Sequence, residues 1–387
     1  MCLAEIRHQR SAQRCLQTAL GGPRAPHAYI FHGPEGVGKE MLARAFARVL
    51  LCEHPAKRAP DSEEEASIAA GGLIIDACGK CEDCTLMSAG SHPDFHLIYR
   101  ELIEFHPDPK VRGRKALDLG VDVIREFLIA AAGSRPLRGR AKVYVVREAE
   151  RMNVAAQNAL LKTLEEPPPD TYIVLVTSSA ARLLPTTRSR AQMVPFGPLP
   201  PEFVCERLLA SEYELTGAEA QFLATVSEGR LGPALESAAD ELHEVKKHLL
   251  SETATLEPGR AVSWAKGVEE AGNCLAEAMS AARSEASQTD LKRHALGQLL
   301  SALAYAFDDV LRLHLGPGEL RAHADQEDLI REMSGRLDPD RAARAVRCLA
   351  EAEANLHRNV NVVLTLEGLG AELTDLLHSA PTGVEGR

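Results

Sequence analysis

The stretch GPEGVGKE, Gly33 to Glu40, decides the fold of this chain. Its spacing is that of a phosphate-binding loop, G-x-x-x-x-G-K-[ST], in which backbone N–H groups wrap around phosphates at a helix N-terminus. A short apolar run, 28–32, precedes the loop, and apolar residues at helical spacing follow it over 39–51. The loop therefore lies between a buried strand and a helix, the context that separates a true phosphate loop from a chance match.

The residues that should carry the chemistry of this loop are only partly present. The nucleotide-binding candidates are Gly33, Gly36, Gly38, Lys39, Glu40, Arg147 and Glu148. Lys39 is placed to reach the outer phosphates, but Glu40 stands where a hydroxyl should hold Mg²⁺. The strand 142–146 should end in an acidic pair that binds Mg²⁺, yet it ends in Arg147, a cation that repels the metal. Glu148 could act as a base, although without a metal a surface charge is the plainer interpretation. We expect no hydrolysis. Either weak nucleotide binding or a bare strand-to-helix turn fits the sequence.

The rest of the chain predicts a parallel α/β domain followed by helices only. Strands are expected at 28–32, 95–99, 142–146 and 172–177, and helices at 39–51, 121–132 and 154–165. Alternating strands and helices indicate a parallel sheet covered on both faces. Strand signals stop after Pro195, and we expect a hinge near 197 and a weaker boundary near 240. The polar, acidic stretch 53–67 is expected to be a mobile insertion.

Three cysteines lie within seven residues, in CGKCEDC. Cys78, Cys81 and Cys84, with Cys52 as a fourth candidate, would suit a closed tetrahedral Zn²⁺ site, which is structural because no position is open for substrate. The alternative is three free cysteines on a short helix. The nine cysteines are clustered, odd in number and without a secretion signal, so a reducing compartment is expected.

Composition and charge restrict the partners. The formal net charge is -11, so contact with DNA would need a local basic face. Two segments offer one, 110–115 and 135–140, and each is either a solvated loop or a contact to template phosphates. No apolar run approaches eighteen residues and no signal peptide is recognised, so we expect a cytoplasmic protein without a membrane span.

An ordered set of motifs resembles a known family. The stretches are HAYIFHGPEGVGKE (27–40), CGKCEDC (78–84), SHPDFHLI (91–98), NALLKTLEEPP (158–168), LPTTRSR (184–190) and HRNVNVVLTLEGL (357–369). Together they resemble the bacterial DNA polymerase III clamp-loader ATPases of the AAA+ superfamily. The resemblance covers nearly the whole chain, except for the last residues and the 53–77 insertion.

That family contains two similar kinds of subunit. The gamma/tau subunits are working ATPases, whereas delta prime shares their fold, often has a decayed nucleotide site and acts as a stator. Here Glu40 and Arg147 replace the two Mg²⁺ anchors, and Gly232 stands where the gamma pattern places a nucleotide-sensing arginine. All three replacements affect nucleotide binding and hydrolysis, so the resemblance implies a delta prime subunit. Such a chain would belong to a DNA-directed DNA polymerase holoenzyme without turning over nucleotide itself.

The resemblance also implies domains and a second functional residue. We expect a RecA-like AAA+ domain over 1–196 with a zinc module at 52–84, a helical lid over 197–240 and an all-α collar over 241–387. Arg190 would act in trans as an arginine finger in a neighbour's ATP site, or else be an ordinary loop charge. The family's Ser-Arg-Cys is Ser-Arg-Ala here, and 25 residues separate Cys52 from Cys78 where the family has a short gap.

The implied partners are the gamma/tau and delta subunits, the sliding clamp and, through the complex, primed DNA. Two other functions stay open at this stage. One is a gamma-type ATPase that uses Glu40 and Glu148 in an unusual site. The other is a zinc-bearing DNA-binding module outside replication.

Overall fold

The computed structural model describes residues 2–23, 25–114, 116, 118–138, 140–282, 287–316, 320–358 and 360–378. The chain divides into two compact units, Met1–Leu199 and Pro200–Arg387, and each is described here by itself. Within the described residues, no helix is long and apolar enough to cross a membrane.

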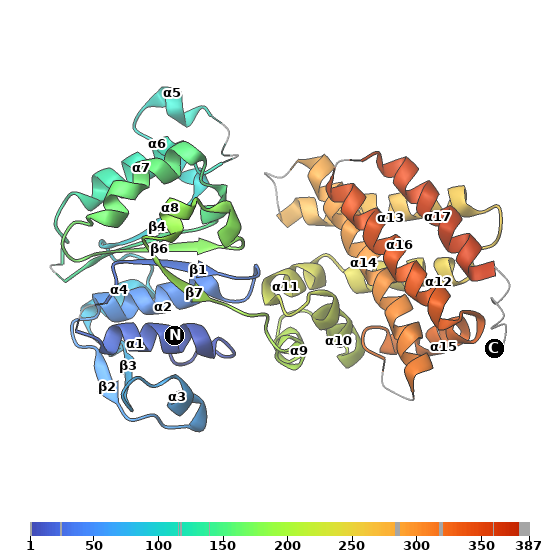
Figure 1. Cartoon of the computed structure of the whole chain (residues 1–387), viewed down its shortest axis with the longest axis horizontal. Coiled ribbons are helices and arrows are strands. Elements are labelled where there is room, and N and C mark those ends of the chain that lie inside the picture. Colours follow the sequence, from blue (N-terminus) through green and yellow to red (C-terminus); the bar gives the residue numbers. More distant parts are fainter. Residues whose placement is uncertain are drawn as a thin grey trace. The chain divides into compact units, whose positions relative to one another are not determined.

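The first unit is built on a five-stranded parallel sheet (Figure 1). The strands follow the order β4-β5-β6-β1-β7, and their bounds are β1 Ala28–His32, β4 Phe95–Ile98, β5 Lys142–Val146, β6 Thr171–Thr177 and β7 Gln192–Pro195. The four predicted strands are confirmed, and the predicted α/β class with them. Strand β7 was missed because it is a short edge strand in which only Val194 is buried, so its hydrophobic signal is weak.

Helices cover both faces of this sheet. Helices α1 (Arg10–Gly21) and α2 (Lys39–Leu51) pack on one face, where the Tyr29 ring meets Phe46 edge to face at 5.0 Å. The opposite face is covered by α6 (Val121–Val123), η2 (Ile124–Ala130) and α7 (Val154–Glu165).

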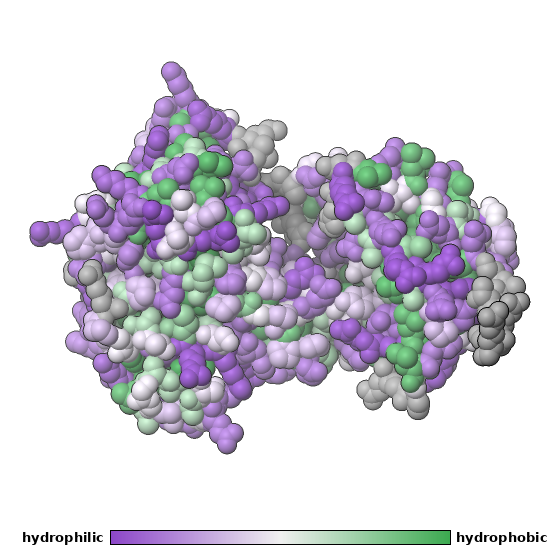
Figure 2. Space-filling model, in the orientation of Figure 1, coloured by the Kyte–Doolittle hydropathy of each residue, from purple (hydrophilic) through white to green (hydrophobic). Residues whose placement is uncertain are grey.

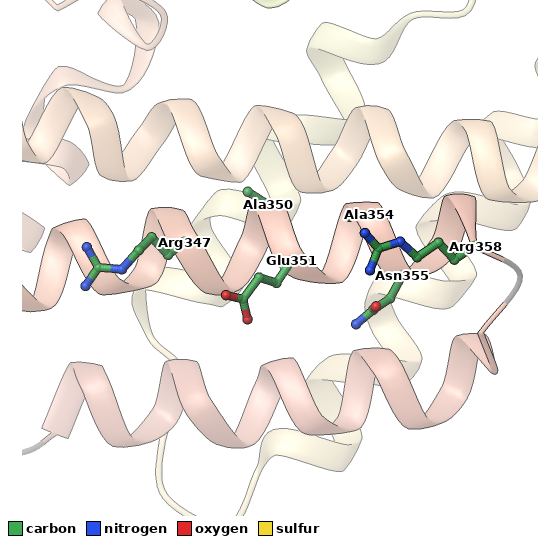
Figure 3. A pocket seen from close by; sticks show the side chains of 6 residues that line it. All are labelled: Arg347, Ala350, Glu351, Ala354, Asn355 and Arg358. Atoms are coloured by element: carbon green, nitrogen blue, oxygen red, sulfur yellow. The ribbon is translucent and has the colours of Figure 1, made fainter.

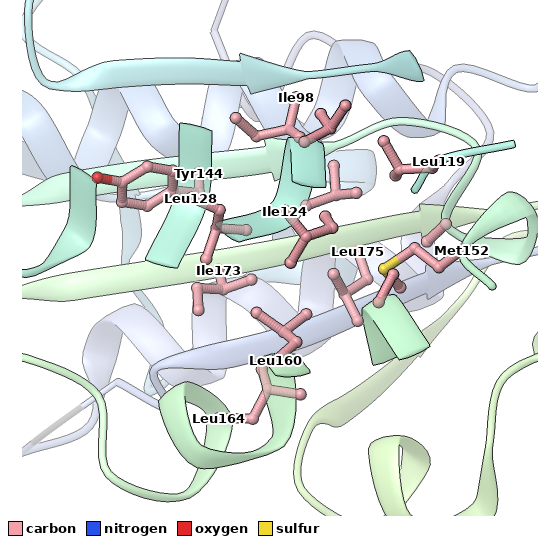
Figure 4. Close-up of a cluster of buried hydrophobic side chains, with 14 of the residues drawn as sticks. Ile98, Leu119, Ile124, Leu128, Tyr144, Met152, Leu160, Leu164, Ile173 and Leu175 are labelled. Atoms are coloured by element: carbon pink, nitrogen blue, oxygen red, sulfur yellow. The ribbon is translucent and has the colours of Figure 1, made fainter. Parts of the chain in front are cut away.

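An apolar core lies between the sheet and the helices η2 and α7 (Figure 4). Ile124 and Leu128 of η2 and Leu160 of α7 pack there against Tyr144 of β5 and the neighbouring strands. The predicted helix over 121–132 is helical throughout, but its middle, η2, winds in wide π-helical turns. This packing fixes where β5 and α7 end, and those two ends carry the functional residues described below.

The prediction of a mobile insertion after residue 53 is wrong. The stretch 53–67 contains β2 (Ala56–Arg58) and most of α3 (Glu63–Ile68), and β2 pairs antiparallel with β3 (Ile74–Asp76), which follows the stretch. Helix α3 packs against α1, and the structure also forms α4 (Glu82–Ser88) directly after the insertion.

Buried apolar and polar contacts explain why this segment is ordered. Ile68 is 2% exposed, and the Gln17 side chain both donates to the Ile75 carbonyl and accepts from the Ile75 N–H. Arg58 binds both oxygens of Glu65, which holds β2 against α3. The polar composition of the segment concealed these few buried isoleucines.

Short helices complete the first unit. They are η1 (Arg100–Phe105), α5 (Pro109–Arg112), η3 (Ala149–Arg151), η4 (Ala180–Arg182) and α8 (Pro185–Arg188).

The second unit is helical, as predicted. Its helices are α9 (Pro201–Leu209), α10 (Gly217–Val226), α11 (Leu231–Ala239), α12 (Leu242–Ala254), α13 (Ala261–Ala282), α14 (Gln288–Leu315), η5 (Ala324–Gln326), α15 (Glu327–Arg336), α16 (Pro339–His357) and α17 (Val362–His378). Helix α14 packs against α13 and α16, and α17 packs against both of these (Figure 1). An apolar stripe that includes Leu299 and Phe307 forms the buried face of α14.

Part of the apolar surface of this unit is exposed. Among the described residues, Val363 and Leu364 at the start of α17 are 45% and 66% exposed. Figure 2 shows further apolar side chains distributed over a mostly hydrophilic face. Along α16, one stripe of six residues lines an open groove of about 550 Å³ (Figure 3): Arg347, Ala350, Glu351, Ala354, Asn355 and Arg358.

Polar contacts join the helices before residue 240 to those after it. In α10, Gln221 donates to the Leu320 carbonyl at 3.1 Å and Thr225 donates to the Arg321 carbonyl at 2.9 Å. Residues 200–387 therefore form one unit. The division into a lid over 197–240 and a collar over 241–387 stays a prediction.

Candidate functional site

The glycine loop joins β1 to α2 as predicted, and its backbone requires glycine at the start. Gly33 has a φ of 148°, and a Cβ there would lie 2.2 Å from the Phe196 carbonyl oxygen. Gly36 and Gly38 also have positive φ, at 71° and 93°. These conformations are accessible to glycine at no steric cost, so the glycines of the motif stand where this backbone needs them.

Lys39 is turned back onto this loop. The side chain is 7% exposed, and Nζ donates to the carbonyl oxygens of Gly33, at 2.7 Å, and Pro34. Burial lowers the pKa of Lys39, while the carboxylates of Glu150 and Glu35 act in the opposite direction. The Lys39 ammonium group therefore makes its hydrogen bonds to carbonyl groups of the loop itself. In a phosphate-binding loop the same group would contact a bound phosphate.

Glu40 and Arg147, the two residues predicted to stand where Mg²⁺ anchors would be, are partners of each other. Arg147, just after β5, places its Nε 2.8 Å from Oε2 of Glu40 in the first turn of α2. The other oxygen of Glu40 accepts from Nε of Arg44 at 2.8 Å. An ion pair therefore spans the gap between the end of β5 and the start of α2, where the loop pattern would place a hydroxyl and a carboxylate around a cation.

Glu148 also has cationic neighbours. It adopts a left-handed backbone with φ 46°, its Oε1 lies 3.2 Å from Nε of Arg151, and its Oε2 lies 3.7 Å from Nε of Arg100. Both carboxylate oxygens of Glu148 therefore face arginine side chains.

Glu150, in η3 shortly after β5, is a second acidic residue beyond this strand, and its role was not expected from the sequence. It accepts from the backbone N–H of Ser178, at 3.2 Å, and from the Ser178 hydroxyl. Burial raises the pKa of Glu150, but hydrogen bonds from Ser178 and Thr177 outweigh burial, so the pKa lies below its usual value. Its carboxylate links the ends of β5 and β6.

The four candidate metal ligands come together. The Sγ atoms of Cys52, Cys78, Cys81 and Cys84 all lie within 4.8 Å of one another, and those of Cys52 and Cys81 are 3.8 Å apart. Zn–S bonds of about 2.3 Å in a tetrahedron give S···S edges of about 3.8 Å. Cys52 follows the last residue of α2, and the fold of the insertion brings the other three back to it. The four cysteines can therefore bind a metal ion.

Backbone N–H groups stabilise thiolates in this cluster. The N–H of Cys81 donates to Sγ of Cys78 at 3.4 Å, and the N–H of Cys78 donates to Sγ of Cys52 at 3.3 Å. Hydrogen bonds from Lys80 and Cys81 lower the pKa of Cys78 to about 6, whereas burial raises that of Cys52 to about 12. A bound metal ion would favour the thiolate form of all four.

A buried polar network ties the cysteine cluster to the sheet. Asp83, which lies between two of the cysteines, binds the Arg138 guanidinium and lies 3.3 Å from Nε2 of His92. The buried Asp94 carboxylate accepts from the backbone N–H groups of Leu137 and Arg138 at 2.7 and 2.8 Å. The SHPDF motif and the arginine segment therefore anchor the cysteine module, a connection that spacing along the chain did not reveal.

This network reduces the basic surface available to DNA. Arg138 is bound to Glu82 and Asp83, and Arg140 donates to the Glu53 carbonyl at 2.7 Å. In the other predicted basic segment Arg114 pairs with Asp122 at 2.8 Å, and Lys115 lies outside the described residues.

Arg190 is held against the end of α7. It follows α8, its Nε lies 2.5 Å from Oε1 of Glu165, and its Nη1 donates to the Thr186 carbonyl at 2.8 Å. Its side chain is 31% exposed. The arginine thus has a fixed direction at the surface, and its contacts are with α7 and its own loop. Gly232, where the resemblance places a nucleotide-sensing arginine in gamma subunits, lies near the start of α11 in the second unit.

These features define a class of protein: a parallel α/β fold with a glycine loop between its first strand and the following helix, and an ion pair between that helix and the end of β5. The sequence model of the family described as "DNA polymerase III, delta subunit" matches residues 8–200. The chain belongs to the delta prime type of bacterial DNA polymerase III clamp-loader subunits.

Individual relatives fit this assignment. The chain is 39% identical to DNA polymerase III subunit delta' of Pseudomonas aeruginosa over 46% of this chain and 45% of that protein. It is 26% identical to subunit delta' of Bacillus subtilis over 93% of this chain and 94% of that protein. It is also 34% identical to subunit gamma/tau of Mycobacterium bovis, but over only 51% of this chain and 29% of that protein.

Proposed function

We propose that this chain is a non-hydrolysing stator of the DNA polymerase III clamp loader, which helps to load the sliding clamp onto primed DNA. The observation that carries the proposal is the ion pair between Glu40 and Arg147. A Mg²⁺ ion held between these positions would meet a guanidinium where it needs a carboxylate and would find no hydroxyl on α2. Glu148, the remaining candidate base, has two arginine neighbours.

The cysteine cluster is proposed to hold one structural Zn²⁺. Four thiolates are the donor set of a closed tetrahedral site, and the separations between the sulfur atoms suit Zn–S bonds. Because Cys52 ends α2 and the other three follow the insertion, the metal would fix the insertion to the helix that carries the loop.

Arg190 is proposed to act in trans on ATP bound to a neighbouring subunit. A guanidinium delivered from outside offsets the charge that gathers on the transferred phosphoryl oxygens. This role needs no working site in the chain that carries the arginine. The proposed partners are the gamma/tau and delta subunits, with the clamp and primed DNA reached through the complex. The three-domain division and a cytoplasmic location remain part of this proposal.

The main alternative is a gamma-type ATPase. The similarity to the gamma/tau subunit of Mycobacterium bovis supports this alternative. Steady-state ATP turnover by the purified chain separates the two functions. We expect no turnover above that of a Lys39→Ala variant, since both Mg²⁺ anchors are replaced. Turnover above this control would contradict the proposal, whereas weak nucleotide binding would not. Co-purification with delta and gamma subunits tests the remaining alternative, a zinc-bearing DNA-binding module outside replication.

A further inference from the structure

Glu165, at the end of α7, and Arg190, in the loop after α8, contact each other at the surface of the first unit. Helix α7 ends at Glu165, within the stretch TLEEPP, and the loop after α8 carries Arg190. Both Nε and Nη2 of Arg190 contact Oε1 of Glu165, with the Nε distance at 2.5 Å. The sequence analysis gave Glu165 no role.

Helix α7 also fixes the backbone of the arginine loop. Oε1 of Gln157 accepts from the Leu184 N–H at 2.7 Å and contacts the buried Thr187 hydroxyl at 3.4 Å. Gln157 and Glu165 are eight residues apart and so lie on one face of the helix, about 12 Å from each other. The loop is therefore held at one point through its backbone and at a second through the guanidinium.

The contact with Glu165 leaves part of the arginine fork free. A guanidinium has five N–H donors. Glu165 takes the Nε hydrogen and one from Nη2, and the two Nη1 hydrogens go to the Thr186 carbonyl at 2.8 Å and to the Ser189 hydroxyl at 3.4 Å. The second Nη2 hydrogen has no partner among the described residues. The contacts of Nε and Nη2 with Glu165 set the direction of the guanidinium. The remaining Nη2 hydrogen can still donate to a phosphate oxygen.

We propose that Glu165 is a positioning residue for Arg190, holding the guanidinium in the direction in which it enters the ATP site of a neighbouring subunit. This inference rests on the proposed role of Arg190 in trans. An arginine on a surface loop otherwise samples many rotamers, and most of them cannot reach the phosphate. Because positioning matters at the transition state, loss of Glu165 lowers kcat while the KM for ATP is unchanged.

The test uses the full complex assembled from this chain with gamma/tau and delta subunits, and measures ATPase activity stimulated by clamp and primed DNA. Glu165→Ala is expected to lower the Arg190-dependent part of kcat about two- to fivefold, the range that corresponds to a partly exposed ion pair. Glu165→Gln, which keeps an acceptor, is expected to lose less. Glu166→Ala is the matched control, because that neighbouring carboxylate makes no ion pair with the described residues, and it should behave as the unaltered chain.

A double variant separates positioning from a general structural role. In the Arg190→Ala background, Glu165→Ala should have no further effect, because the group that it positions is gone. Additive losses, unchanged activity of Glu165→Ala, or a rise in kcat would each overturn the inference while leaving Arg190 as a finger. If Arg190→Ala itself has no effect in a correctly assembled complex, the role of Arg190 in trans fails, and that of Glu165 fails with it.

Discussion

The ion pair between Lys246 and Asp325 is expected to hold the second unit together. Lys246 of α12 is 2% exposed, and its Nζ lies 2.6 Å from Oδ1 of Asp325 in η5 and 4.5 Å from the centre of the Phe222 ring in α10. Burial lowers the pKa of Lys246, and Asp325 opposes that effect. Oδ2 of Asp325 is buried and makes no hydrogen bond within the described part of the chain.

The size of the effect follows from this burial. Lys246→Met leaves the mostly buried Asp325 carboxylate without the one cation that pairs with it among the described residues, and breaking a buried pair in this way costs about 3–5 kcal/mol. Lys246→Met/Asp325→Leu removes both charges and should recover most of that loss. The control is Lys292→Met, because Lys292 and Glu269 also lie 2.6 Å apart but are both 28% exposed. Breaking that pair should cost less than about 1 kcal/mol.

Urea unfolding combined with hydrogen exchange measures the effect. The chain has two units, so a single unfolding free energy is not sufficient, and exchange of amides in α10, α12 and η5 locates the change. Lys246→Met should accelerate exchange in all three elements together. The reasoning is refuted if Lys246→Met is as mild as Lys292→Met, or if the double variant recovers nothing. Faster exchange in α10 alone would instead favour a lid that opens separately from the helices after residue 240.

Four further outcomes are expected. Cys78→Ser should lower the zinc content of protein prepared without chelator, measured by elemental analysis, because it removes one of four thiolates. Arg190→Ala should partly lower the stimulated ATPase of the assembled complex, and Arg188→Ala in the same loop should do far less. Ile68→Ala should cost about 2–5 kcal/mol in denaturant unfolding, because Ile68 is buried in the insertion. Hydrogen bonds from Thr216 and Lys247 lower the pKa of Glu219 to about 2, so its stabilising effect is lost as pH falls below about 4.3. Glu219→Gln should therefore flatten the acid limb of a plot of melting temperature against pH.

Local patterns were enough for much of the fold. The apolar runs around β1 and β5, the helical spacing after Gly38 and the absence of strand signals beyond β7 predicted the parallel sheet and the helical second half. The same patterns failed at β7 and in the insertion after residue 53. In both places, a few buried residues lie within polar sequence, and periodicity is a weak signal when only one or two side chains face the core.

The candidate functional residues also fall into two groups, those recognised from the sequence and those recognised only from the fold. The sequence by itself determined that the loop lacks its Mg²⁺ anchors and that three cysteines lie at metal-ligand spacing, since residue identity and short spacing are enough for both. Only the tertiary structure decided that Cys52 joins those cysteines, that Arg147 pairs with Glu40 and that Glu165 holds Arg190. These contacts join segments far apart in the chain, and the order of strands in the sheet and the ends of its helices bring them within ion-pair distance. Sequence spacing carries no information about such distances until the fold is known.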